Sequence, residues 1–227
     1  NSLLVEGIDH KNGKKSVKYS MAFDGMLPYE VKLFTSATHA SEDVALPEVI
    51  RSQVKHDENH HNIYILDRGV QSASTMKDFA REAIPFIVRA KENRKYIEIE
   101  SFITETSNVD LGSLELLKDC KVYLYRGVHL TTKKGTKRWK EELFEVPFRL
   151  IVARGKDDPG KEFWFITNDF DLSAKEITDA YRRRWDIEVF FCFIKQELNA
   201  SHLVSLNKNG IERLCRIGTT FFDDLQS

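Results

Sequence analysis

One stretch near the end of the chain constrains the fold more than any other. Residues 174–198 follow the 3.6-residue period of an α-helix, and Ser173 with Glu176 fits a capping box at its start. From Trp185 onward the side chains are mostly apolar, whereas an ordinary surface helix has one apolar stripe and a broad polar face. The sequence therefore predicts a long helix that is buried on most sides and packs within a larger fold.

Four polar side chains of this helix fall on one narrow stripe. At about 100° per residue, a stripe about 60° wide holds four of them: Tyr181, Arg184, Glu188 and Lys195. The simplest interpretation is a salt bridge between Arg184 and Glu188, which are four positions apart, and such a pair stabilises a helix little. The alternative is a functional surface, because a carboxylate, a guanidinium and an ammonium group are aligned along it.

Short apolar runs and helical patterns alternate upstream of this helix. Strands are expected at residues 62–66, 83–90 and 162–168, a hairpin at 17–35, and helices at 41–54 and 74–82. The first of these apolar runs ends directly at Asp67, which Arg68 and Gly69 follow. The alternation predicts an α/β layer fold.

Residues 96–155 have a different character, with β-like segments and little helical pattern. We expect a β-rich insertion here, between a first core part at residues 1–95 and a second at 156–227 that carries the Glu188 helix. A basic turn is expected at residues 133–140, either solvated or in contact with the DNA backbone. Its basic residues and one tryptophan are Lys133, Lys134, Lys137, Arg138, Trp139 and Lys140.

Composition narrows the functional classes. The 227 residues are 41% hydrophobic and 30% charged, which is typical of a globular protein. No apolar stretch approaches the ~20 residues that span a bilayer, and no signal peptide is visible, so a cytoplasmic location without membrane contact is expected. The net charge of −1 argues against a globally basic nucleic-acid binder, so any such site is a local patch. The three cysteines form no CxxC pair, which argues against a thiolate zinc site.

The spacing of the polar stripe matches a known signature. Tyr181-x2-Arg184-x3-Glu188-x6-Lys195 resembles the YREK motif of the bacterial DDE insertion-sequence transposases. The surrounding stretch from FITND to KQEL and the upstream segment YILDRGV also resemble that family, over roughly residues 15–200. The resemblance implies a ribonuclease-H-like catalytic domain, with a mixed sheet flanked by helices. Such a domain cleaves the ends of a mobile element and joins them to target DNA.

The resemblance also implies a site. Asp67 and Glu188 would be catalytic ligands of two Mg²⁺ (or Mn²⁺) ions, while Tyr181, Arg184 and Lys195 would contact DNA beside the scissile phosphate. The implied partners are double-stranded DNA, as element ends and as target, and a second copy of the chain in a homodimeric synaptic complex. The implied location is the bacterial cytoplasm, near the nucleoid.

The family requires three carboxylates, and the chain offers two upstream candidates for the first. Asp9 lies in a polar stretch that is typical of a loop, and Asp24 is followed by Gly25 as in a hairpin turn. Neither resembles a catalytic aspartate within a strand, so we expect the first aspartate upstream of Asn1 and no cleavage by the chain as given. The alternatives are a stand-alone metal-dependent DNA nuclease and a catalytically dead DNA-binding relic.

Two histidine positions invite a metal interpretation. His39 resembles a family position near an acidic residue, and a structural or supporting role is expected for it. His60 and His61 are adjacent in a polar segment, and neighbouring residues seldom share a metal ion. A solvated loop is the expectation there.

Overall fold

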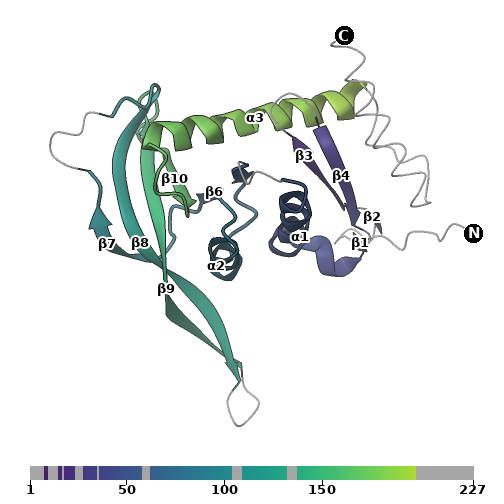
Figure 1. Cartoon of the computed structure of the whole chain (residues 1–227), viewed down its shortest axis with the longest axis horizontal. Coiled ribbons are helices and arrows are strands. Elements are labelled where there is room, and N and C mark those ends of the chain that lie inside the picture. Colours follow the sequence, from purple (N-terminus) through teal and green to yellow (C-terminus); the bar gives the residue numbers. More distant parts are fainter. Residues whose placement is uncertain are drawn as a thin grey trace, which may run out of the picture. The chain divides into compact units, whose positions relative to one another are not determined.

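The computed structural model describes residues 8–9, 15–16, 18–23, 28–34, 36–57, 62–103, 109–131 and 137–197 (Figure 1). The chain divides into two compact units. The sheet unit is Val54–Tyr181, and the hairpin unit combines Asn1–Gln53 with Arg182–Ser227.

The sheet unit is built on a six-stranded sheet with the order β5-β6-β10-β9-β8-β7. Its strands are β5 (Tyr64–Leu66), β6 (Phe86–Ala90), β7 (Tyr96–Ser101), β8 (Leu114–Thr131), β9 (Lys137–Gly155) and β10 (Glu162–Thr167). Strands β5 and β6 are parallel, and the other neighbours are antiparallel. The prediction of an α/β fold with a mixed sheet flanked by helices is therefore confirmed.

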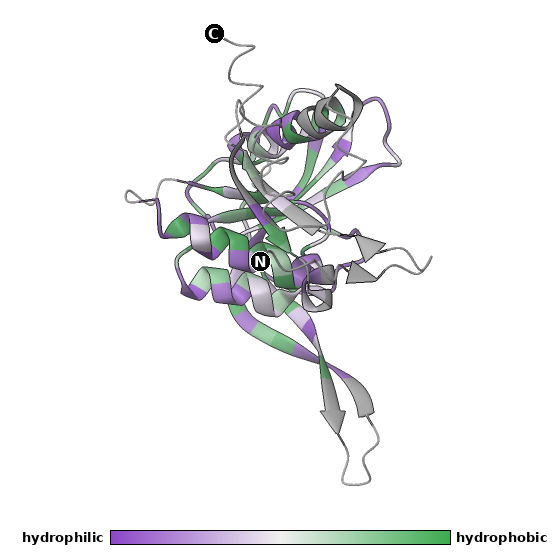
Figure 2. Ribbon diagram, turned by 90° about the vertical axis from the view of Figure 1, so that its right-hand side faces the viewer, coloured by the Kyte–Doolittle hydropathy of each residue, from purple (hydrophilic) through white to green (hydrophobic). Residues whose placement is uncertain are grey.

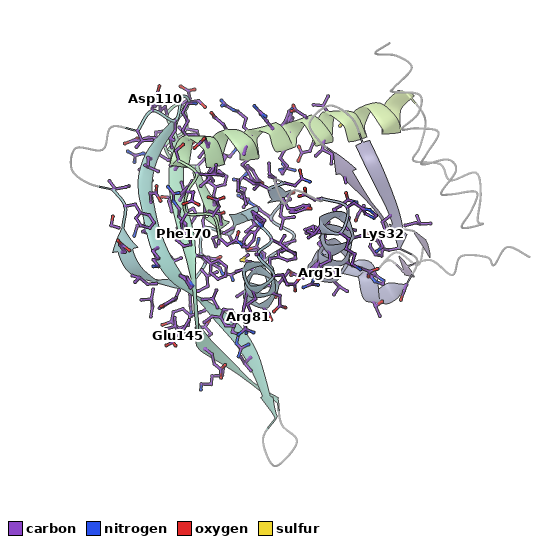
Figure 3. The ribbon with its side chains drawn as sticks, in the orientation of Figure 1. Lys32, Arg51, Arg81, Asp110, Glu145 and Phe170 are labelled. Atoms are coloured by element: carbon purple, nitrogen blue, oxygen red, sulfur yellow. The ribbon has the colours of Figure 1, made fainter. Side chains whose placement is uncertain are left out.

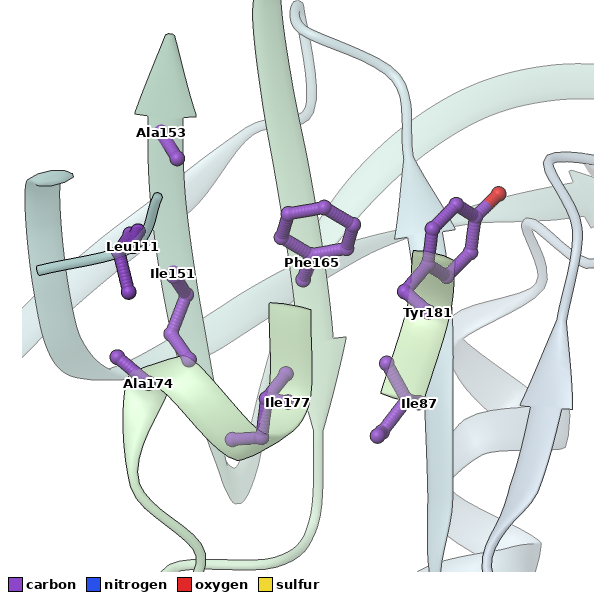
Figure 4. Packing of buried hydrophobic residues seen from close by; sticks show 8 residues of the cluster. All are labelled: Ile87, Leu111, Ile151, Ala153, Phe165, Ala174, Ile177 and Tyr181. Atoms are coloured by element: carbon purple, nitrogen blue, oxygen red, sulfur yellow. The ribbon is translucent and has the colours of Figure 1, made fainter. Parts of the chain in front are cut away.

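Helices cover both faces of this sheet. Helix α2 (Ala73–Arg81) packs Phe79 against Phe86 of β6, with ring centroids 5.9 Å apart. Successive strand residues point to opposite faces, so Ile87 faces the other side, where helix α3 (Ala174–Glu197) begins. The cluster on that side is drawn in Figure 4 and consists of Ile87, Leu111, Ile151, Ala153, Phe165, Ala174, Ile177 and Tyr181.

Strands β8 and β9 continue beyond the sheet as a two-stranded ribbon of alternating hydrophobic and hydrophilic segments (Figures 1 and 2). A register shift lies where Tyr123 pairs with Pro147 but Leu124 pairs with Phe144, leaving Glu145 (Figure 3) and Val146 in a β-bulge.

The ribbon corrects the expected basic turn at residues 133–140. Residues 137–140 belong to β9, because their pairing with residues 128–131 of β8 extends the ladder. Lys133 and Lys134 lie outside the described residues, and the division of the chain into a core and an insertion stays a prediction.

The hairpin unit contains the predicted hairpin, with β3 (Lys18–Phe23) antiparallel to β4 (Pro28–Phe34). The short helix η1 (Ala37–Ala40) follows, and the predicted helix is α1 (Glu42–Val54). Strand β1 (Ile8–Asp9) pairs with β2 (Lys15–Ser16), so Asp9 lies opposite Lys15 in a short strand, and the loop expected there is wrong. Asp24 lies outside the described residues.

Helix α3 begins at the predicted residue and is continuous to Glu197. The prediction that it is buried on most sides is wrong, because Trp185 and Val189 are 63% and 54% exposed. At about 100° per residue these two lie roughly 40° and 80° from Tyr181, so the open side of the helix extends beyond the polar stripe. None of the described helices is long and apolar enough to cross a membrane.

Candidate active site

Asp67 stands at the carboxyl end of β5, where the chain turns at once. The backbone N–H of Val70 donates to the carbonyl of Asp67 over 3.2 Å, which closes a tight turn. The carboxylate is exposed, and its Oδ1 accepts hydrogen bonds from the backbone N–H of Arg68 (2.7 Å) and from the hydroxyl group of Tyr181 (3.3 Å). A strand end thus presents an oriented carboxylate to solvent.

Tyr181 reaches Asp67 from the first part of α3. Its ring is buried in the cluster of Figure 4 and lies 5.0 Å from the ring of Phe165, while its hydroxyl group points away from the cluster. A buried tyrosine commonly combines such an apolar body with a polar end that finds a partner. The structure therefore brings together Asp67 and Tyr181, two of the residues that the sequence singles out.

Arg89 is a further charged residue at this strand end, and the sequence interpretation missed it. Leu66 of β5 pairs with Val88 of β6 in parallel register, so the next residues, Asp67 and Arg89, follow at the same edge. The guanidinium group lies 4.6 Å from the ring centroid of Phe163. The available signal was that a second apolar run, like the first, ends in a charged residue.

The electrostatics of Arg89 reflect this position. Partial burial lowers the pKa of Arg89, and the positive charge of Arg68 lowers it further. The groups of Tyr181 and Asp67 act in the opposite direction. A partly desolvated cation beside a carboxylate is suited to an anion such as a DNA phosphate.

Gln71 fixes the backbone around these two side chains. Its Nε2 donates to the carbonyl of Arg68 over 2.7 Å and to the carbonyl of Arg89 over 3.1 Å. The backbone carbonyl of Gln71 accepts a hydrogen bond from Nη1 of Arg94 over 2.5 Å. The turn that carries Asp67 is thereby joined to the strand that carries Arg89.

The start of α3 is closed by the predicted capping box. The N–H of Ser173 donates to Oε2 of Glu176 over 2.7 Å, and the N–H of Glu176 donates to Oγ of Ser173 over 3.2 Å. Hydrogen bonds from the side chain and backbone of Ser173 lower the pKa of Glu176. Upstream, Oδ1 of Asp169 accepts from the N–H groups of Asp171 and Leu172, each over 2.9 Å.

Arg184 and Glu188 form an ion pair on the part of α3 that belongs to the hairpin unit. Nη2 of Arg184 donates to Oε1 of Glu188 over 2.5 Å, so the salt bridge expected between these two residues is present. Lys195 lies on the same helix, but its side chain is outside the described residues. Among the side chains that the structure describes, no group of three or more His, Cys, Asp or Glu residues is arranged to hold a metal ion.

His39 makes contacts that agree with a structural role. Its ring stacks on Phe34 with centroids 4.6 Å apart, and its Nε2 lies 3.0 Å from Oε2 of Glu48. Glu48 also pairs with Lys32 over 2.8 Å, and these contacts lower the pKa of Glu48. His60 and His61 lie outside the described residues.

Known proteins resemble this chain over most of its length. A curated relative, the probable transposase for insertion sequence element IS5377 of Geobacillus stearothermophilus, is 27% identical over 153 residues. That match covers 67% of this chain but only 36% of the relative. Among solved structures, the piggyBac transposase in a synaptic complex with hairpin DNA has a TM-score of 0.43 and 11% identity, with 100% of this chain and 53% of that chain covered.

A family model also matches this chain. The model described as the transposase DDE domain matches residues 4–219, which is nearly the whole sequence. The chain therefore belongs to the family of transposase DDE domains.

Proposed function

We propose that this chain provides the catalytic site of an insertion-sequence transposase, which cleaves DNA at the ends of a mobile element and joins those ends to a target. The observation that carries the proposal is the hydrogen bond between Tyr181 and Asp67. Both residues belong to the signature that the sequence shares with these transposases, although they lie far apart in the chain. Their direct contact is what a common site requires.

Asp67 and Glu188 are the proposed ligands of Mg²⁺ or Mn²⁺. The donor chemistry fits, because both ions prefer carboxylate oxygens and Asp67 presents an exposed carboxylate at a rigid strand end. Bound divalent ions would stabilise the attacking and leaving oxygens of an in-line phosphodiester displacement. The protein's own part is to hold the carboxylates in place. Tyr181 orients that of Asp67, because its hydroxyl group donates a hydrogen bond to Oδ1.

The cationic side chains are the proposed contacts to the DNA backbone. Arg184 and Lys195 share the polar stripe of α3, and Arg89 lies beside Asp67. A guanidinium group can bind a phosphate through two parallel hydrogen bonds, whereas an ammonium group acts as a point charge. Arg184 already holds the carboxylate of Glu188, so an incoming phosphate would share this guanidinium or replace that carboxylate. Such contacts position the DNA without reading its sequence.

The proposal extends to the assembly. The partners are double-stranded DNA at the element ends and at the target, and a second copy of the chain in the synaptic complex. A stand-alone DNA nuclease would share the cleavage step but would not join the ends to a target.

The test uses the complete transposase with duplex oligonucleotides that carry the terminal inverted repeat, in the presence of Mg²⁺. We expect Asp67→Asn and Glu188→Gln each to abolish cleavage while the dissociation constant for the end duplex changes little. Asp110→Asn, at an exposed carboxylate, is the matched control and should cleave normally. Cleavage by both site variants at the control rate would refute the proposal, and cleavage without joining to a target plasmid would favour a nuclease.

A further inference from the structure

A buried ion pair connects two strands beneath the start of α3. Nε of Arg149 donates to Oδ1 of Asp119 over 2.8 Å and Nη2 donates to Oδ2 over 2.7 Å, so the pair is bidentate. Each side chain is only 8% exposed. Asp119 of β8 pairs with Ile151 of β9, a member of the cluster that packs against α3, so the ion pair lies on the sheet face that α3 covers.

The guanidinium group of Arg149 makes a third hydrogen bond, to a second residue. Nη1 of Arg149 donates to the carbonyl of Leu172, the residue directly before the cap Ser173. The ring of Phe102 lies 5.6 Å from Cζ of Arg149 and covers it further. One planar group therefore joins β8, β9 and the chain segment from which α3 begins.

Stability alone does not explain this arrangement. Removing two charges from water costs about as much as their attraction returns, and apolar residues of similar volume often serve as well or better. A buried ion pair is better explained where it selects one geometry among several. Here the geometry that it selects is the position of Leu172, and with it the direction in which α3 leaves the sheet.

That direction matters because Tyr181 contacts Asp67 from within the first part of α3. Tyr181 is seven residues beyond Ala174, which is about 10 Å at 1.5 Å per residue. A tilt of about 5° at the start of a straight helix moves a residue at that distance by about 1 Å. Displacements of about 1 Å in a catalytic group can slow a reaction roughly 100-fold.

We infer that Asp119 and Arg149 are positioning residues, which set the direction of the first part of α3 and thereby the place of the Tyr181 hydroxyl group beside Asp67. The inference rests on the proposed function of Asp67. It predicts that loss of the contact to Leu172 slows cleavage without weakening the binding of DNA ends.

The first test replaces both charges by apolar residues, as Asp119→Leu with Arg149→Met, in the complete transposase. Because neither charge is left buried alone, the fold should persist. We expect the first-order rate of cleavage of a bound end duplex to fall roughly 10- to 100-fold, with the dissociation constant for that duplex unchanged. The matched control is Glu115→Leu with Arg154→Met, which removes an exposed pair between the same two strands that has no described contact with α3.

A second variant covers the case in which the first does not fold. Arg149→Lys leaves a positive charge beside Asp119, but an ammonium group cannot reproduce the three-way planar geometry. We expect the same loss in cleavage rate and a normal binding constant. Cleavage at the control rate in either folded variant would overturn the inference, and so would unfolding of both, because the pair would then be a stability element.

Hydrogen exchange separates this inference from the proposed function. In the 227-residue chain, the amides of residues 172–176 should exchange at least about tenfold faster in the folded variants than in the Glu115→Leu, Arg154→Met control. If the complete wild-type protein cleaves no DNA, the proposed function fails and the exchange data still show whether Arg149 fixes the start of α3. Unchanged exchange at these amides would overturn the inference whatever the activity.

Discussion

The hydroxyl oxygen of Tyr181 lies 3.3 Å from Oδ1 of Asp67, across 114 positions of the sequence. The ring of Tyr181 is held against Phe165, so the packing of α3 on the sheet determines where this hydroxyl group lies. The same Oδ1 also accepts the N–H of Arg68. Two donors therefore fix one oxygen of the carboxylate in one orientation.

Tyr181→Phe removes the hydroxyl group and keeps the buried ring. We expect the free energy of unfolding to fall by about 1 kcal/mol or less, because one hydrogen bond at the edge of the core is lost. Cleavage should slow several-fold, since Asp67 loses the donor that Tyr181 supplies. Urea unfolding and single-turnover cleavage measure the two effects, and Tyr181→Ala should by contrast lose about 3 kcal/mol through the cavity that it leaves. A Phe variant with wild-type cleavage would show that the hydroxyl group has no part in the reaction.

Arg184→Ala should weaken the binding of element ends and lower the slope of log K against log salt by about one. The reason is that a phosphate contact releases a counterion, which an exposed arginine outside the interface does not do. Arg183→Ala, at the neighbouring exposed position, is the control and should leave the slope unchanged. Equal slopes for wild type and Arg184→Ala in a titration by fluorescence anisotropy would argue against a phosphate contact.

Gln71→Glu replaces an amide donor by a carboxylate that faces two carbonyl oxygens. We expect a loss of roughly 2 kcal/mol in the free energy of unfolding, at about 1 kcal/mol for each lost hydrogen bond. Cleavage should fall further than stability explains, because the turn of Asp67 is no longer joined to the strand of Arg89. Asn93→Asp makes the same chemical change at an exposed position and serves as the control. Equal behaviour of the two variants would refute this role of Gln71.

The capping box predicts a pH dependence at the start of α3. The pKa of Glu176 in the folded chain is lowered from 4.5 by its hydrogen bonds to Ser173. A lowered pKa means that the carboxylate stabilises the fold above pH 4.5 and that this contribution is lost as the pH falls through the lower value. Hydrogen exchange at residues 173–177 should therefore quicken on acidification, relative to the intrinsic rate, in the wild type. Glu176→Gln should show no such step, and a step of equal size in that variant would assign the titration to another group.

Local patterns explain which parts of the fold the sequence predicts. The cap and start of α3, the end of β5 at Asp67 and the hairpin of β3 and β4 depend on neighbouring residues, and all are found. The place of Arg89 depends on the parallel register of β5 and β6, which no single segment encodes.

Longer-range features escape the sequence for the same reason. The pair of Asp119 and Arg149 is recognisable only once β8 and β9 are aligned, because the two residues lie 30 positions apart in the chain. The length of β9 is missed because residues 137–142 are mostly charged. Sequence patterns identify a strand by the apolar residues that it buries, and this part of β9 lacks such a pattern.

Strand β10 pairs with β6 on one side and with β9 on the other. A ribosome adds residues in order, so β6 is complete long before β10 emerges. Until then, the edge of β6 that β10 covers in the folded chain has no strand paired with it. Open strand edges are sites of aggregation during synthesis. The contact of Tyr181 with Asp67 can form only later still, because α3 follows β10. A nascent chain interrupted before residue 181 therefore carries Asp67 without the Tyr181 hydroxyl group, and the proposed site is assembled only after α3 has emerged.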